Sequence, residues 1–533
     1  MVQGRLLVIA GSDCSGGAGL EADQKVIAAH GCYAMTATTA LTAQNTLGVY
    51  DIHPVPPAFL RKQIDACFDD IGVDVVKTGM LASTETITAV AEALERRDFS
   101  GSLVVDPVMV ATTGAELLPP EALRELRGRL LPRATVLTPN IPEARLLLAD
   151  AGLGAALPEP LAGVADLEAA GRALLSLGPE WVLVKGGHAP LRRGDYAAAG
   201  TDAERGVVVD VLCGKDGCVR IETDFQTSRN THGTGCSLAC YDRRSSYGKK
   251  DTDRVGFAAA IASNLAKGMP VPQAVKAACR YIQAGIQTAP GLGSGNGPLN
   301  HFHSTCTLPF SPGHFVEWML ERPDVAPVWH RFINHPFVLA MGNGTLPLES
   351  FKGYLVQDYL YLIQFARANA LAGYKAKNMR DISAAAAIVG HIDRETALHL
   401  TYCEGFGVSR EEMESTEEKQ ACTAYTRYVL DIGQSQDWLG LQVALAPCLL
   451  GYGALAKMLH GDSKSVREGN HYWNWVENYV ADDYVQAVKT GSELLERNAV
   501  LQSPSRVEEI VKIFIHATKM EIGFWEMFPH GRK

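Results

Sequence analysis

Hydrophobic residues follow two different patterns in the two halves of the chain. From residue 5 to about 290, short runs rich in Val, Ile and Leu alternate with alanine-rich amphipathic stretches; the runs are LLVIAG, VDVVKTGM, SLVVDPVM, ATVLTPN and WVLVKGG. Apolar runs of this length, separated by helices, are typical of buried parallel strands. The first half is therefore predicted to be an α/β domain with a mostly parallel sheet covered on both faces.

The second half shows no β-rich alternation. Long helical patterns such as LESFKGYLVQDYLYLIQFARANALAGYKA appear instead, and they predict an all-α bundle. Between the halves, the stretch APGLGSGNGPLNHFH is rich in Gly, Pro and Asn and ends the α/β pattern. We therefore predict domains at 1–290 and 313–533, joined by a linker at 291–312.

Composition and charge narrow the classes of function. The chain has 533 residues, which suits two large domains. Its 49 basic and 59 acidic residues give a net charge of -10, which argues against nucleic acid or a membrane as a partner and favours small molecules. The apolar run near the N-terminus is too short for a signal peptide. The 12 cysteines form no CxxC pair, so we expect neither a zinc site nor a disulfide framework, and a cytoplasmic protein.

Polar or glycine residues end the predicted strands of the first half. Ligands of parallel sheets bind at the carboxyl ends of strands. The residues expected there are Gly11, residues 78–80, Asp106, Asn140 and residues 185–187. A binding site is therefore predicted at this edge of the sheet.

Residues 231–236, THGTGC, place two glycines where a loop enters an alanine-rich helical run. Backbone amides at such a helix start can hold a developing phosphate charge. Together with the glycine-rich loop GSDCSGGAG at residues 11–19, this segment favours phosphoryl transfer. Cys236 is either a thiol whose pKa the helix start lowers or a small buried hydrophobe.

Two further pairs are candidates for binding in the first half. Asp23 and Gln44 offer an anionic acceptor and an amide that could pair with the edge of a heterocycle. Either residue could instead be a helix surface residue or a cap. Asn140 and Glu143 follow a strand at i, i+3. They could face a magnesium ion and its waters, or form a capping box at the start of a helix, which the spacing fits equally well.

In the second half, Pro447 suits a helix start or a kink, so Cys448 is expected in a first turn where the helix dipole favours a thiolate. Tyr452 lies at i+4 on the same face, and Asp358 and Tyr361 form an i, i+3 pair. With Glu521 from the terminal helix, these side chains could supply a nucleophile, an acid and an aromatic wall. Singly, each is also common as a structural residue.

The first-half motifs resemble the ribokinase-like hydroxymethylpyrimidine kinase/phosphomethylpyrimidine kinase family of thiamin biosynthesis, from Leu7 to about Phe302. The matching strings include AGSDCSGGAGLEADQKV, VVDPVMVATTGAELL, LTPNIPEARLLL and THGTGCSLA. The resemblance implies an aminopyrimidine pocket, an anion hole with the catalytic Cys236, a magnesium site reached through water, and contacts to the ATP phosphates. The pocket would consist of Gly11, Asp23, Gln44 and Met80, and the anion hole of Gly233, Thr234, Gly235 and Cys236. The magnesium site would involve Asn140 and Glu143, and the ATP phosphates would lie near Lys185 and Thr231.

One segment departs from this family. Residues 240–258, CYDRRSSYGKKDTDRVGFA, separate two stretches that run almost directly together in the family. A charged, glycine-containing insert interrupts the helix that should hold the phosphate. We therefore expect either a segment that loops out or an impaired anion hole.

The second half resembles the TenA/thiaminase II family over about residues 308–533, through strings such as LAPCLLGYG, NWVENY and MEIGFWEMF. This resemblance implies Cys448 as nucleophile, Glu521 as the acid that protonates the pyrimidine, and Asp358 as the carboxylate that orients the ring amino group. It implies four tyrosines as the pocket wall: Tyr361, Tyr425, Tyr452 and Tyr479.

The combination resembles the fungal bifunctional thiamin enzymes. It implies a kinase that uses ATP and Mg²⁺ to phosphorylate hydroxymethylpyrimidine and its monophosphate, and a hydrolase that releases hydroxymethylpyrimidine from thiamin or its aminopyrimidine breakdown products. We expect aminopyrimidines and ATP as ligands, and a homo-oligomer. The alternatives are a pyridoxal-type kinase, or a ligand-binding pseudokinase or regulator in which only the second half is active.

Overall fold

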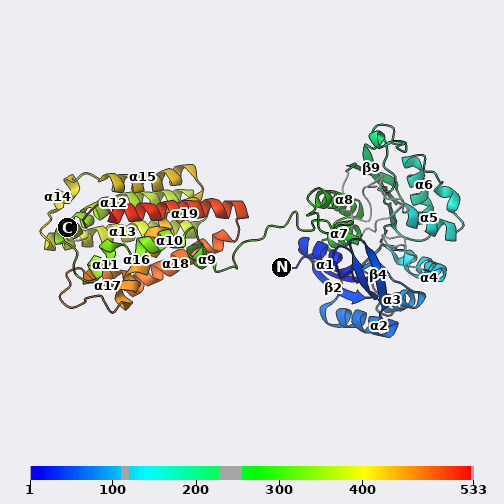
Figure 1. The fold of residues 1–533 in the computed structure, drawn as a ribbon, viewed down its shortest axis with the longest axis horizontal. Helices are drawn as coiled ribbons and strands as arrows, with labels where there is room; N and C mark the ends of the chain where they lie inside the picture. Colours follow the sequence, from blue (N-terminus) through cyan, green and yellow to red (C-terminus); the bar gives the residue numbers. More distant parts are fainter. Residues whose placement is uncertain (1, 110–118, 227–254, 530–533) are drawn as a thin grey trace. The chain divides into compact units, whose positions relative to one another are not determined.

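The computed structural model describes residues 2–109, 119–226 and 255–529. The chain divides into two compact units, Met1–Thr305 and Cys306–Lys533 (Figure 1). The first is an α/β unit and the second is helical, so the predicted fold class is confirmed.

The first unit is built on an eight-stranded sheet in the order β10-β9-β8-β7-β6-β5-β1-β2. Its strands are β1 (Arg5–Ala10), β2 (Tyr33–Thr38), β5 (Val75–Thr78), β6 (Ser102–Val105), β7 (Val136–Leu137), β8 (Trp181–Val184), β9 (Val207–Gly214) and β10 (Gly217–Asp224). Six strands of this sheet run parallel to their neighbours: β1, β2, β5, β6, β7 and β8. The other two, β9 and β10, are antiparallel to their neighbours. The mostly parallel sheet is thus as predicted.

Helices cover both faces of this sheet. They are α1 (Gly19–Ala29), α2 (Pro57–Ala66), α3 (Thr84–Arg96), α4 (Pro120–Glu125), α5 (Ile141–Asp150), α6 (Val164–Leu175), α7 (Val255–Ala266) and α8 (Val271–Gln287). One set, α2–α6, covers one face and a second set, α1, α7 and α8, covers the other (Figure 1). Leu7 and Ile9 of β1 pack with residues of the first set, whereas Leu6 and Val8 pack with residues of the second. Because both faces are buried, the strands read as continuous apolar runs.

A second, two-stranded antiparallel sheet consists of β3 (Ala40–Asn45) and β4 (Gly48–Pro54). We call this hairpin, residues 40–54, the flap. Several of its large apolar side chains are exposed, Tyr50 by 66% of its surface. The flap lies against the glycine-rich loop, because the amide of Ser12 donates to the carbonyl of Ala40 (2.9 Å) and the hydroxyl of Thr42 donates to the carbonyl of Ser12 (2.8 Å).

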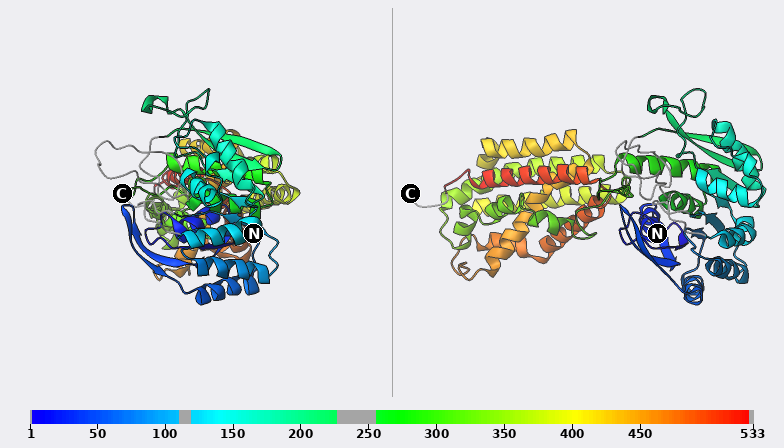
Figure 2. Two further views of the ribbon diagram at one scale, coloured as in Figure 1. Left: turned by 90° about the vertical axis from the view of Figure 1, so that its right-hand side faces the viewer. Right: turned by 45° about the vertical axis from the view of Figure 1, so that its right-hand side comes forward.

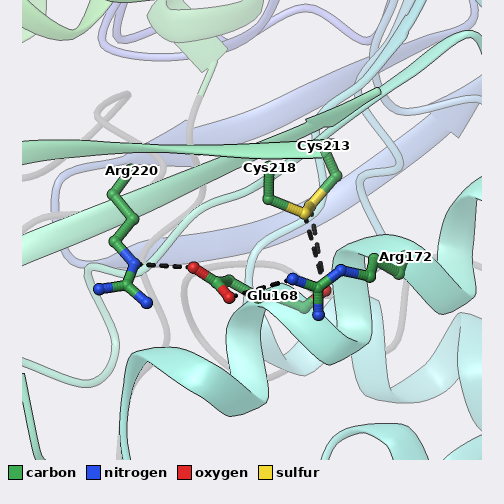
Figure 3. Close-up of a disulfide and its surroundings, with 5 residues drawn as sticks. All are labelled: Glu168, Arg172, Cys213, Cys218 and Arg220. Atoms are coloured by element: carbon green, nitrogen blue, oxygen red, sulfur yellow. Dashed lines mark hydrogen bonds and ion pairs between the residues drawn. A yellow bond between two sulfur atoms is a disulfide. The ribbon is translucent and has the colours of Figure 1, made fainter. Parts of the chain in front are cut away.

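A disulfide joins β9 and β10. Cys213 and Cys218 lie directly opposite each other in the antiparallel ladder, with Cα atoms 4.0 Å apart. Beside them, Glu168 of α6 accepts hydrogen bonds from Arg220 (2.7 Å) and Arg172 (3.2 Å) (Figure 3). The expectation of no disulfide was wrong for this pair, because the five-residue spacing gave no sign that a tight hairpin would bring the two cysteines together.

The second unit is a bundle of helices that run side by side over much of their length (Figure 2). They are α9 (Phe315–Glu321), α10 (Ala326–Ile333), α11 (Pro336–Gly342), α12 (Leu348–Lys375), α13 (Met379–Gly405), α14 (Arg410–Ser415), α15 (Gln420–Ser435), α16 (Trp438–Gly461), α17 (Trp473–Val480), α18 (Asp482–Ala499) and α19 (Pro504–Trp525).

Helix α16 is the central helix of this bundle. By length and composition it is the one helix of the described residues that could cross a membrane, but 72% of its apolar window is buried inside the structure. It packs against α15, α17, α18 and α19. Its apolar sequence is therefore explained by its place in the core.

Candidate active sites

The carboxyl ends of the parallel strands bring together several predicted residues of the first unit. Gly11 follows β1 and Met80 follows β5, the strand beside it. A Cβ atom on Gly11 would overlap the Cε atom of Met80, so the two residues are in contact, and a larger residue at position 11 would have to displace the end of the Met80 side chain. Because β2 lies on one side of β1 and β5 on the other, this is the crevice where a ligand is expected in an open α/β sheet.

The glycine-rich loop connects β1 to α1 at this edge of the sheet. The carboxylate of Asp13 accepts hydrogen bonds from the amides of Gly17 (3.0 Å) and Ala18 (2.7 Å), which shapes the loop before α1 begins. Gly19 has a φ of +57°, a conformation that favours glycine. Gln44 of the flap lies beside the loop, since the backbone N–H of Gln44 donates to Cys14 Sγ (3.3 Å). The structure thus places Gln44 near the crevice.

Asp23 is fully buried on α1 and pairs with Lys77 of β5. The distance from Lys77 Nζ to Asp23 Oδ2 is 2.7 Å, and both side chains are almost inaccessible to solvent. Burial raises the pKa of Asp23 to about 7, although the ammonium of Lys77 pulls that pKa down. The other oxygen, Oδ1, has no hydrogen-bond partner among the described residues. A buried acceptor of this kind is suited to a donor on a ligand.

Lys185, at the end of β8, belongs to a second buried ion pair. Its Nζ lies 3.0 Å from Asp106 Oδ1, which also accepts from the hydroxyl of Thr138 (2.9 Å). Asp106 Oδ2 has no partner among the described residues. The charge of Asp106 contributes to the raised pKa of Asp23, so the two carboxylates lie near each other.

Asn140 and Glu143 form the capping box that the sequence left open as an alternative. The amide of Glu143 donates to Asn140 Oδ1 and the amide of Asn140 donates to Glu143 Oε2, each at 2.8 Å. These contacts lie at the start of α5, just after the carboxyl end of β7. Asn140 also forms an isolated β-bridge with Lys185, so the two residues are neighbours. A role for either residue at a magnesium ion stays a prediction.

The predicted anion hole lies outside the described residues. It comprises Thr231, Gly233, Thr234, Gly235 and Cys236, and most of the segment 240–258 lies outside as well. The last residues of that segment belong to α7, which begins at Val255.

Seven predicted residues of the second unit lie on five helices of one core. They are Asp358 and Tyr361 on α12, Tyr425 on α15, Cys448 and Tyr452 on α16, Tyr479 on α17, and Glu521 on α19. Cys448 is partly buried and the other six are buried. The rings of Tyr361 and Tyr425 are 5.0 Å apart, and those of Tyr452 and Tyr479 are 5.2 Å apart.

Glu521 is the strongest candidate acid in this core. Its Oε1 accepts a hydrogen bond from the hydroxyl of Tyr425 (2.7 Å). Burial, helped by the nearby charge of Asp358 and opposed by the hydrogen bond from Tyr425, raises the pKa of Glu521 to about 8. Glu521 is therefore protonated at neutral pH and can give up a proton.

Cys448 lies near the same groups. Burial raises the pKa of Tyr361 well above its usual value, and the next largest cause is Cys448. Cys448 also contributes to the raised pKa of Tyr425 and of Tyr452, after burial and other neighbours. The prediction that Cys448 lies in a first helical turn was wrong, because Pro447 lies inside α16 and the helix begins at Trp438. The helix dipole therefore does not explain a thiolate here.

Several site residues were missed by reasoning from the sequence. Lys77 stands out in VDVVKTGM as a charged residue in a buried strand, where an ion needs a partner. Tyr354, one turn before Asp358 on α12, is fully buried and interacts with Tyr452. Trp475 Nε1 and Trp525 Nε1 are buried without a hydrogen-bond partner among the described residues. No signal in the sequence separates these aromatic residues from ordinary core residues.

Comparison with known proteins gives a family for each of the two units. A family described as phosphomethylpyrimidine kinase matches residues 13–241 and 254–300, and the TENA/THI-4/PQQC family matches residues 322–529. The break in the first match falls within the segment 240–258.

Two fungal relatives match this chain over nearly its whole length. A relative from Schizosaccharomyces pombe is 41% identical over 98% of this chain and 90% of its own length. Hydroxymethylpyrimidine/phosphomethylpyrimidine kinase THI20 from Saccharomyces cerevisiae is 32% identical over 98% of this chain and 94% of its own length. Among solved structures, the pyridoxal kinase from Staphylococcus aureus in complex with AMP-PCP and pyridoxal is 29% identical, with a TM-score of 0.45, and covers 57% of this chain and 94% of that chain. The chain belongs to the hydroxymethylpyrimidine/phosphomethylpyrimidine kinases of thiamin biosynthesis that carry a C-terminal TENA/THI-4 domain.

Proposed function

We propose that the two units act on the same aminopyrimidine ring, one by hydrolysis and the other by phosphorylation. The second unit would release hydroxymethylpyrimidine from thiamin or from an aminopyrimidine breakdown product. The first would transfer phosphate from ATP to the hydroxymethyl oxygen and then to the monophosphate. The observation that carries the hydrolytic part is the buried Glu521, whose pKa is raised to about 8, in the same core as Cys448 and a second carboxylate, Asp358.

In the second unit these groups take separate roles. The sulfur of Cys448 attacks the pyrimidine as the nucleophile while the protonated Glu521 delivers a proton to a ring nitrogen. Asp358 accepts a hydrogen bond from the ring amino group and fixes the orientation of the ring. The leaving group departs from the methylene carbon, water replaces it, and the sulfur is released. The tyrosines of the pocket wall hold the flat ring in the core.

In the first unit, Gly11, Met80, Asp23 and Gln44 would hold the pyrimidine. Asp23 Oδ1, which no described residue satisfies, would accept from the ring amino group. Lys185 would stabilise negative charge on the ATP phosphates, and the amides of residues 233–236 would do the same for the transferred group.

Magnesium would be held at the carboxyl edge of the sheet. Asp106 Oδ2 is a buried carboxylate oxygen without a partner among the described residues, and magnesium prefers such oxygens. We therefore propose Asp106, together with Asn140 and Glu143 through water, as the magnesium site. When bound, the ion would neutralise charge on the phosphates.

The hydrolytic part is tested without ATP. The full chain is incubated with thiamin, and separately with 4-amino-5-aminomethyl-2-methylpyrimidine, and hydroxymethylpyrimidine is measured by chromatography. Release from either substrate supports the proposal and identifies the leaving group. If neither substrate releases it, the second unit is not a hydrolase of this class.

A further inference from the structure

The segment that follows α8 is attached to the flap. We call residues 293–303 the strap. The amide of Asn296 donates to the carbonyl of Thr46 (3.0 Å), and the amide of Gly295 donates to the hydroxyl of Thr46 (3.3 Å). Thr46 lies at the tip of the flap, in the turn between β3 and β4. A segment that the sequence assigned to the linker is therefore bonded to the first unit.

Two glycines allow this close approach. A Cβ atom on Gly295 would overlap the carbonyl oxygen of Thr46, and a Cβ atom on Gly293 would meet the side chain of Thr46. Gly293 also has a φ of +81°, which favours glycine. The contact between strap and flap thus depends on glycine at 295 in particular, because there the obstacle is backbone and cannot rotate away.

The other end of the strap is fixed to the helical layer. The amide of Asn300 donates to the carbonyl of Gly285 (3.1 Å), and a ring nitrogen of His303 lies 2.9 Å from the carbonyl oxygen of Tyr281. Leu299 is buried in the core that α1, α7 and α8 share. The strap therefore ties the flap tip to α8, a rigid element of the unit.

The flap needs such a support. It is a two-stranded hairpin outside the main sheet, and an isolated hairpin of two strands is only marginally stable in water. Gln44 lies on it, two residues before Thr46. The contacts on one side come from the glycine-rich loop, through Ser12 and Cys14, and those at the tip come from the strap.

We propose that the strap positions Gln44 for pyrimidine binding, so that the contact of Gly295 and Asn296 with Thr46 helps to determine the affinity of the kinase for its alcohol substrate. The inference rests on the proposed role of Gln44 in the kinase pocket. Thr46 and Gly295 are positioning residues, because they act through the flap and not on the substrate.

The test uses four variants of the full chain and steady-state kinetics with hydroxymethylpyrimidine and with ATP. Thr46→Val removes the hydroxyl and keeps the shape of the side chain, whereas Thr46→Ser keeps the hydroxyl. Gly295→Ala introduces the overlap with the flap. Ser294→Ala is the matched control, because Ser294 is an exposed neighbour in the strap.

Thr46→Val should raise the KM for hydroxymethylpyrimidine about fivefold, the effect of one hydrogen bond on a binding equilibrium. Gly295→Ala should raise it more, about tenfold or beyond. The KM for ATP and the rate at saturation should stay near those of the unchanged protein, and Thr46→Ser and Ser294→Ala should behave normally. A role in stability alone would lower the amount of active enzyme and the rate, but would not change one KM selectively.

An unchanged KM for hydroxymethylpyrimidine in both Thr46→Val and Gly295→Ala would overturn the proposal. If Gly295→Ala does not fold, as judged by its melting curve, Thr46→Val against Thr46→Ser decides. If both variants keep their KM but Gln44→Ala raises it, Gln44 binds the pyrimidine and only the strap proposal fails. If Gln44→Ala also leaves the KM for hydroxymethylpyrimidine unchanged, both the strap proposal and the proposed role of Gln44 fail.

Discussion

The two units give their buried carboxyl groups different partners. In the α/β unit, Asp23 and Asp106 each have a lysine ammonium within hydrogen-bond distance, supplied by Lys77 and Lys185. In the helical unit, Glu521 is equally buried but its described partner is the neutral hydroxyl of Tyr425. The ammonium of Lys77 lowers the pKa of Asp23, but burial outweighs it and leaves that pKa at about 7, whereas burial raises the pKa of Glu521 to about 8. The comparison is thus between buried carboxyl groups that have a counter-ion and one whose described partner is uncharged.

The two sites also differ in the elements that carry them. The kinase site is assembled from loops at strand ends, and its predicted anion hole lies outside the described residues. The proposed hydrolase site is assembled from side chains on five helices. A substitution in one should leave the other unit active, and the predictions below use this separation.

The largest effect is expected from Cys448→Ala or Cys448→Ser. Release of hydroxymethylpyrimidine should fall to the uncatalysed level, because a methyl group or a hydroxyl cannot replace a sulfur nucleophile at neutral pH. The kinase rate should not change. Cys306→Ser, at an exposed free cysteine, is the control. Near-normal hydrolysis by Cys448→Ser would remove Cys448 from the mechanism.

The Asp23–Lys77 pair tests the ionic side of the comparison. Asp23→Asn leaves the Lys77 ammonium buried and unpaired, which should lower the free energy of unfolding of the α/β unit by about 3–5 kcal/mol. The double change Asp23→Leu with Lys77→Met should cost less than the sum of the single changes. Glu121→Gln, in an exposed ion pair with Arg124, should cost under about 1 kcal/mol. Equal losses at the buried and exposed pairs in denaturant titrations would contradict this account.

Glu521→Gln tests the neutral side. Hydrolysis should fall by about 10²-fold, the usual scale for a positioned acid. In the unchanged protein, hydrolysis should decline as pH rises through about 8, where Glu521 loses its proton, and this decline should be absent from the residual activity of the variant. An activity that rises with pH through this range would show that Glu521 acts as a base.

The same group makes stability depend on pH. The pKa of Glu521 is raised above its usual value of 4.5, so the folded state keeps a proton that the unfolded state releases between pH 4.5 and about 8. Its contribution to stability is complete below pH 4.5 and is lost as pH rises through about 8. Glu521→Gln should therefore melt no lower than the unchanged protein at pH 8, although it is less active.

The smallest effect in this series concerns specificity. Gln44→Ala should raise the KM for hydroxymethylpyrimidine by a factor that corresponds to about 1–3 kcal/mol, because donors and acceptors of the ring lose their partner. Pyridoxal should be a poor substrate of the unchanged protein. Faster phosphorylation of pyridoxal than of hydroxymethylpyrimidine would favour the pyridoxal-type alternative.

Much of the fold follows from local patterns in the sequence. The continuous apolar runs predicted parallel strands because such strands are buried on both faces, and the strand ends predicted the edge where Gly11, Asp106 and Lys185 gather. Asn140 and Glu143 show the limit of spacing, since one pattern fits both a capping box and a metal site.

Long-range contacts were not predictable in the same way. Cys213 and Cys218 meet only because β9 and β10 form a tight hairpin, and the strap contacts the flap across about 250 residues of sequence. Pro447 was misjudged because proline usually marks a helix start, whereas here α16 continues through it within a packed core. Such features depend on tertiary packing, which a single sequence does not display.

The central claim is that both units work on one ring, and a coupled assay tests it directly. The full chain is given ATP, Mg²⁺ and the aminopyrimidine substrate that it hydrolyses, and the pyrimidine products are followed by mass spectrometry. We expect hydroxymethylpyrimidine monophosphate and diphosphate. Cys448→Ala should yield neither from this substrate but should phosphorylate supplied hydroxymethylpyrimidine at the normal rate. Accumulation of unphosphorylated hydroxymethylpyrimidine by the unchanged protein, or phosphorylated product from Cys448→Ala, would contradict the account.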